Sequence, residues 1–169
     1  SADNAPGYRI RRLRDVLSGE ESFALDDMQA LQMDWFNGQA KRLLPVLLTE
    51  LDLTQLDPTD RAALSALKDW QIEPMDAPEL AAPLIYAAWY QTLATALFKE
   101  TLGEKLFTRL MGRSYVLNHA IDNLLLKDAT SPWWQDRRSA LITDSFKQTI
   151  TDLSESTGRP LDTWRWDNY

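Results

Sequence analysis

Residues 80–98 read LAAPLIYAAWYQTLATALF, and this uncharged stretch of 19 residues decides the predicted fold. Its length approaches the roughly 20 residues that a helix needs to cross a bilayer. Pro83, Gln91 and two threonines interrupt it, however, and its alanines dilute its hydrophobicity, so we expect no membrane span. We expect instead a helix at about 79–100 that is buried on nearly all sides, with the other helices packed around it.

The flanks of this stretch carry helix start and stop signals. Asp76 or Ala77 precedes it, Pro78 suits a first helical turn, and Gly103 lies just beyond the expected end. These residues predict a helix that begins near Pro78 and a break at Gly103.

Apolar residues recur at helical spacing through most of the remaining chain. Further helices are predicted at 8–17, 28–39, 58–70, 103–111, 114–126 and 137–155, with Pro45 kinking or restarting a helix and Gly158 ending the last one. No convincing β alternation is present. The sequence therefore predicts an all-α fold, an irregular multi-helix bundle in one domain spanning 1–169, with non-helical ends at 1–7 and 159–169.

Two of these helices carry specific expectations about burial. In 28–39, Met28, Leu31, Trp35 and Phe36 fall on one side at helical spacing. Gln32 falls on the same side, so we expect its amide to hydrogen-bond a loop or a neighbouring helix. In 114–126, the residues expected to be buried are Val116, Leu117, Ala120, Ile121, Leu124 and Leu125.

The composition excludes several classes of function. The net charge is −7 and no basic face runs through the chain, which argues against nucleic-acid binding. There are no cysteines, which excludes disulfides and cysteine-rich zinc sites. Of seven tryptophans, four lie between residues 133 and 166, and we expect these rings to dock on an apolar surface.

The residues alone indicate no catalytic machinery and no metal or cofactor site. His119 is the only histidine and lies beside an apolar stripe, so we interpret it as structural. The carboxylates that are adjacent in sequence, such as Asp26 and Asp27, do not face each other on a helix and make poor catalytic pairs. Ser1 lies in a stretch expected to be coil, and an arbitrary chain start explains it better than a nucleophile does.

Several ordered motifs carry a resemblance to a known family. They are YRIRRLRDVL at 8–17, LDDMQALQMD at 25–34, RLLPVLL at 42–48, LKDW at 67–70, and GRPL at 158–161 followed by WRW at 164–166. In this order and spacing they resemble the penicillin acylase (penicillin amidase) family of N-terminal nucleophile hydrolases. The resemblance runs from about Asn4 to the end of the chain, although Asp167 stands where the family usually has glycine.

The resemblance implies that the chain is the helical part of a β chain, excised from a large, self-processed periplasmic or secreted enzyme. Such enzymes cleave amide bonds of acylated small molecules, including penicillins and acyl-homoserine lactones. Their nucleophile is a serine at the start of the β chain, usually followed by asparagine, in an αββα core. Ser1-Ala2 does not match that start. We therefore expect the catalytic core and the α chain to be partners, and these 169 residues alone to be inactive.

One site residue carries over from the resemblance. The family has an arginine lining the active site at the start of this helix, and Arg9 matches it best, with further arginines at 11, 12 and 14. A guanidinium at that position has a fixed fork of donors that can hold a catalytic backbone segment in place.

Two other classes of function remain open. A stand-alone helical interaction protein would use the arginines at 9–14 to bind an acidic partner. A membrane-associated bundle has only residues 80–98 in its favour. We also expect both ends of the chain to be boundaries within a longer protein, and aromatic residues exposed by the truncation to favour a dimer.

Overall fold

A computed structural model describes residues 7–19 and 22–165, and within them the chain is all-α, as predicted. Expectations for Ser1, Asn4, Trp166 and Asp167 fall outside the described residues. The described α-helices are α1 (Tyr8–Leu17), α2 (Leu25–Gln32), α3 (Gly38–Glu50), α4 (Pro58–Trp70), α5 (Ala81–Met111), α6 (Ser114–Leu126) and α7 (Arg138–Thr157). Short 3₁₀ turns are η1 (Leu53–Gln55), η2 (Pro132–Trp134) and η3 (Leu161–Thr163), the last within the stretch expected to be non-helical.

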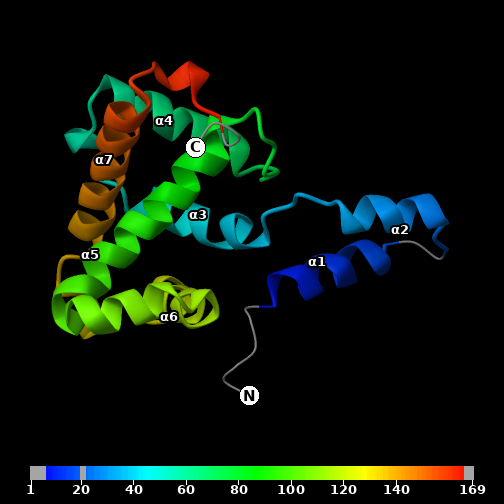
Figure 1. The fold of residues 1–169 in the computed structure, drawn as a ribbon, viewed down its shortest axis with the longest axis horizontal. Helices are drawn as coiled ribbons and strands as arrows, with labels where there is room; N and C mark the ends of the chain where they lie inside the picture. The colour runs from blue at the N-terminus through cyan, green and yellow to red at the C-terminus, as the bar shows by residue number, and fades with distance from the viewer. Residues whose placement is uncertain (1–6, 20–21, 166–169) are drawn as a thin grey trace.

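The central helix is α5, which crosses the molecule with α4, α6 and α7 packed around it (Figure 1). It begins at Ala81, so Pro78 lies before the helix and Pro83 occupies its first turn. Gly103 breaks it as predicted, because φ +71° and ψ 162° are open only to glycine. No helix among the described residues is both long and apolar enough to cross a membrane.

The most extensive helix contact is between α5 and α7, which lie side by side in Figure 1. Trp89 is fully buried and its ring centroid lies 4.8 Å from that of Phe146. The indole nitrogen also donates to Ser145 Oγ at 3.1 Å. An indole is therefore accommodated in the core because α7 supplies both an aromatic ring and a hydrogen-bond acceptor.

The prediction of one helix over 28–39 is wrong. The helix ends at Gln32 and the chain stays non-helical until α3 begins at Gly38. Two side chains favour this break, since Asp34 accepts a hydrogen bond from Phe36 N (3.1 Å) and Asn37 caps α3 by accepting from Ala40 N (2.8 Å). Gln32, which was expected to face the core, is consequently exposed.

Three further expectations about these helices are corrected. Met28 and Trp35 are 40% and 49% exposed, because Met28 lies on a helix that projects from the bundle and Trp35 lies beyond the end of that helix. Val116 is 37% exposed, while its neighbour Leu117 is buried. Pro45 lies inside a continuous α3 and does not restart the helix.

The tryptophans near the C-terminal end dock on the chain's own core. Trp134 and Trp164 are 1% and 2% exposed. Trp133 is half-buried, with its ring 5.1 Å from that of Phe98 in an edge-on contact. Gly158 ends α7 in the left-handed conformation, as predicted. Among the tryptophans of the described residues, the exposed one is Trp35, which is far in sequence from the C-terminal end.

Candidate functional site

Helices α1 and α2 form an arm that projects from the bundle (Figure 1). No residue of α1 is buried, and Leu31 is the one buried residue of α2. Large apolar side chains of the arm remain exposed, among them Ile10 (57%), Leu25 (73%) and Met33 (72%). Part of the apolar face of α1 therefore faces outward.

Arg9 binds the C-terminal end of α2. Its Nη1 donates to the carbonyl oxygen of Asp34 at 3.3 Å, and its Nη2 donates to those of Leu31 and Gln32. The last carbonyls of a helix lack partners within the helix and carry a partial negative charge, so a guanidinium suits this position. Arg9 thereby ties the two helices of the arm together while its side chain stays exposed.

Arg12 and Asp34 form the ion pair of the arm. Arg12 Nε lies 2.7 Å from Asp34 Oδ2, and the carboxylate side chain is only 8% exposed. The guanidinium also lies 4.4 Å from the centroid of the Phe36 ring. Burial tends to raise the pKa of Asp34, but the hydrogen bonds from Arg12 and from Phe36 N outweigh burial and hold that pKa below its usual value.

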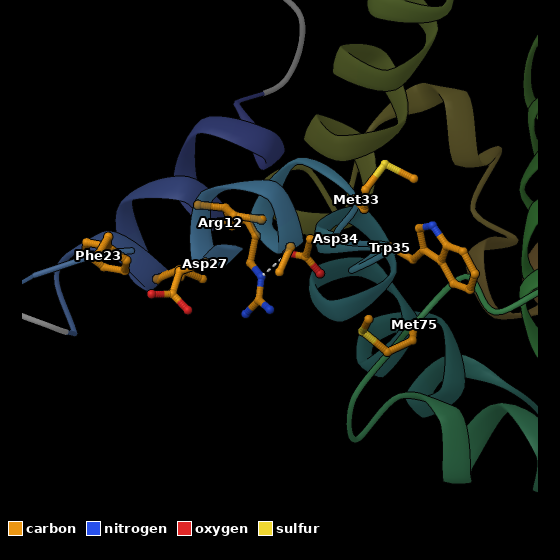
Figure 2. Close-up of a pocket in the computed structure, with 10 residues that line it drawn as sticks. Arg12, Phe23, Asp27, Met33, Asp34, Trp35 and Met75 are labelled. Atoms are coloured by element: carbon orange, nitrogen blue, oxygen red, sulfur yellow. Dashed lines mark hydrogen bonds and ion pairs between the residues drawn. The ribbon is translucent and has the colours of Figure 1, made fainter. Parts of the chain in front are cut away.

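A hollow of about 560 Å³ lies beside this ion pair. Figure 2 shows Phe23 and Asp27 at one end and Trp35 and Met75 at the other, with the bonded Arg12 between them. Its walls are otherwise apolar, supplied by Val16, Ala30, Leu31 and Met33. An open, mainly apolar hollow with one ion pair suits an apolar side chain or acyl group better than a charged one.

The base of the arm is fixed to the bundle at two places. On α1, the hydroxyl of Tyr8 donates to Asp122 of α6, and Gly38 approaches Tyr8 so closely that an added Cβ would lie 3.4 Å from the tyrosine Cβ. Beyond α2, Asn37 N donates to Pro74 O at 2.8 Å and Asp76 N donates to Trp35 O at 2.9 Å. The second attachment makes the isolated bridge between Phe36 and Met75.

The tyrosines near the contact between Tyr8 and Asp122 have raised pKa values. Burial, followed by the hydrogen bond to Asp122, raises the pKa of the Tyr8 hydroxyl well above its usual value. Burial likewise raises the pKa of Tyr90, whose hydroxyl donates to Asn118 Oδ1 at 2.9 Å, and that of Tyr86. These phenols therefore stay protonated over the working range of pH, and those of Tyr8 and Tyr90 act as hydrogen-bond donors.

Other residues considered from the sequence have structural contacts. His119 lies on α6, half-buried, beside Asp122 and not in the hollow. Asp27 caps α2 by accepting from Ala24 N at 2.8 Å, and Glu50 pairs with Arg138. Within 7–19 and 22–165, no three side chains are grouped so that they would hold a metal ion.

The arginine patch expected at 9–14 is partly used within the fold. Arg9 and Arg12 make the contacts described above, and Arg11 lies 4.8 Å from the ring centroid of Tyr8. This weakens the idea of one continuous basic surface for an acidic partner. Asp34 and Asp122, which organise the arm, were missed by sequence reasoning because their partners are 22 and 114 residues away.

Comparison with known proteins gives one result that bears on function. A family model described as penicillin amidase matches residues 1–169. A search of curated proteins finds no match for this chain.

Proposed function

Because the chain belongs to the penicillin amidase family, we propose that it is the helical domain of an amide-bond hydrolase whose nucleophile lies elsewhere in the enzyme. The family match over residues 1–169 is the observation that carries this proposal. The substrates would be acylated small molecules such as penicillins or acyl-homoserine lactones, and the nucleophile an N-terminal serine. A periplasmic or secreted location follows from the same family resemblance.

The arm is the part of this domain that we assign to the active site of the whole enzyme. Arg9 would line that site, with both terminal nitrogens of its guanidinium held by carbonyls at and just beyond the end of α2. An arginine presents five N–H donors, so donors remain for a backbone or substrate oxygen. Fixing the guanidinium in advance reduces the cost of ordering a long side chain during the reaction.

The same arm is the natural contact with the rest of the enzyme, meaning its catalytic core and α chain. It carries exposed apolar side chains and an apolar hollow, while the bundle behind it has a packed core of its own. Isolated exposed apolar residues are common, but a group of them on one projecting element marks a binding surface. Without the rest of the enzyme, a dimer of this chain would bury the same group together with Trp35.

The proposal is tested in the enzyme that contains these residues. Replacing Arg9 by methionine should lower kcat/KM for an acylated amide substrate by about tenfold or more, as expected when a positioned charged donor is lost. Arg14→Met is the matched control, since Arg14 lies on the same helix and is exposed. Equal effects of the two substitutions, with unchanged helical content, would remove Arg9 from the site.

The 169 residues alone should not hydrolyse such substrates. The reason is that the proposed nucleophile, an N-terminal serine in the catalytic core, lies elsewhere in the enzyme. Release of the free amine by the purified chain, measured against a blank and a heat-treated sample, would contradict this part of the proposal.

A further inference from the structure

A second, smaller pocket of about 170 Å³ lies at the base of the arm, where α1 meets α3 and α6. Its lining includes Arg11 of α1, Arg42 of α3 and Lys127 at the end of α6. Asp122 contributes the carboxylate in its wall. It shares none of its lining residues with the apolar hollow beside Arg12.

The pocket concentrates positive charge in an acidic protein. Three cationic side chains from three segments border it, although the chain carries a net charge of −7. None of the ion pairs found among the described residues includes Arg11, Arg42 or Lys127. The charges of Arg11 and Arg42 lower the pKa of Tyr8, whereas burial raises it. Both guanidinium groups therefore lie near the Tyr8–Asp122 pair. Converging cations that form no ion pair with another described residue are an arrangement suited to an anion.

The carboxylate in the wall restricts which anion fits. Asp122 is only 8% exposed, and its Oδ2 accepts the hydrogen bond from Tyr8. Its Oδ1 is buried and has no hydrogen-bond partner among the described residues. A buried acceptor without a donor is costly, and an ionised one more so. A bound group that carries its own O–H would satisfy Asp122, whereas a fully deprotonated anion would be repelled by it.

We propose that this pocket binds hydrogen phosphate, with Arg11, Arg42 and Lys127 holding the phosphate oxygens and Asp122 accepting the phosphate O–H. Guanidinium forks match the geometry of phosphate oxygens, and an ammonium adds a point charge. Sulfate has the same size and shape but no O–H at neutral pH, so Asp122 discriminates against it. This binding is independent of amide hydrolysis and does not rest on the role proposed for Arg9.

The test is isothermal titration of the 169-residue chain with sodium phosphate and, separately, sodium sulfate at matched ionic strength. Phosphate should bind with one-to-one saturation, and sulfate should bind at least about fivefold more weakly because Asp122 lacks a donor there. Arg42→Gln should weaken phosphate binding about tenfold, the loss expected for one charge-assisted contact. The control Arg14→Gln removes the same charge from an exposed position outside the pocket and should leave the affinity unchanged.

Three outcomes would overturn the proposal. The first is absence of saturable binding up to tens of millimolar phosphate, and the second is equal binding by the Arg42→Gln and Arg14→Gln variants. The third concerns Asp3, the carboxylate nearest in sequence to Gly7 of the pocket lining, which lies outside the described residues. If phosphate binds only after Asp3→Asn, the chain's own carboxylate is the occupant.

A further variant tests the role given to Asp122. Asp122→Asn should bring the affinities for phosphate and sulfate close together, and an unchanged ratio of the two affinities would refute that role.

Discussion

Replacing Arg138 by methionine should be among the most damaging single substitutions outside the apolar core. Arg138 begins α7, and its guanidinium joins three elements of the bundle. Nε donates to Glu50 Oε1 at 3.0 Å, Nη1 to Leu124 O at 2.9 Å and Nη2 to Leu125 O at 3.1 Å. The guanidinium carbon also lies 4.6 Å from the ring centroid of Trp134.

The size of the effect follows from these contacts. Leu124 and Leu125 belong to the last turn of α6, where the helix provides no partner for the carbonyls. A hydrogen bond from a charged donor contributes ~1.5–3 kcal/mol, so the lower value for two bonds gives about 3 kcal/mol. The contact with Trp134 adds ~0.5 kcal/mol. Glu50 adds little, because its side chain is 32% exposed and regains water when the arginine is lost.

The neighbouring residue supplies the control. Arg137 Nη2 lies 3.5 Å from Asp144 Oδ2, and both side chains are more than half exposed. Arg137→Met should therefore cost less than ~1 kcal/mol, as exposed ion pairs do. Urea unfolding followed by far-UV circular dichroism gives the free energies of unfolding, provided that the slope with denaturant is the same for both variants. Losses that agree within about 1 kcal/mol would refute the view that Arg138 caps α6.

Two further predictions use the same unfolding measurement. Gly103→Ala should cost ~1–3 kcal/mol, because φ +71° with ψ 162° is strained for any residue with a Cβ, and no neighbouring atom lies near enough to add a clash. Gly158→Ala, at the left-handed C-cap of α7, should cost ~1 kcal/mol. A larger loss at position 158 than at position 103 would contradict the view that the backbone at Gly103 is the more strained of the two. Asp34→Asn should destabilise the chain near neutral pH, because the folded-state pKa of Asp34 is lowered and its ionised form is favoured by folding. That difference should shrink as pH falls below the unfolded-state value of about 3.9, and a gap that persists in acid would exclude the ion pair with Arg12 as its cause.

Sequence reasoning reached the family but only part of the candidate site. The motif order pointed to the family that the comparison then matched over 1–169. Arg9 was singled out by resemblance, and its active-site role stays a prediction. Its contacts with the end of α2 were not predicted. The sequence pattern predicted a helix that continued to residue 39, and in such a helix the carbonyls that Arg9 binds would have partners within the helix.

Local physics determined what the sequence predicted well. The apolar run at 80–98 made α5 the central helix, Gly103 broke it, and the helix predicted at 58–70 is α4. Each of these signals acts within a few residues, where helical spacing, a cap or a backbone dihedral leaves a visible pattern.

Tertiary structure alone decided the arm and both of its pockets. Tyr8 bonds Asp122 across 114 residues, and Arg12 bonds Asp34 across 22, so no local pattern announces either pair. The same holds for the convergence of Arg11, Arg42 and Lys127, which come from three different segments. A charged residue on a helix face reads the same in sequence whether it faces water or a partner. Which of the two it meets depends on where distant helices pack, and that is a property of the whole fold.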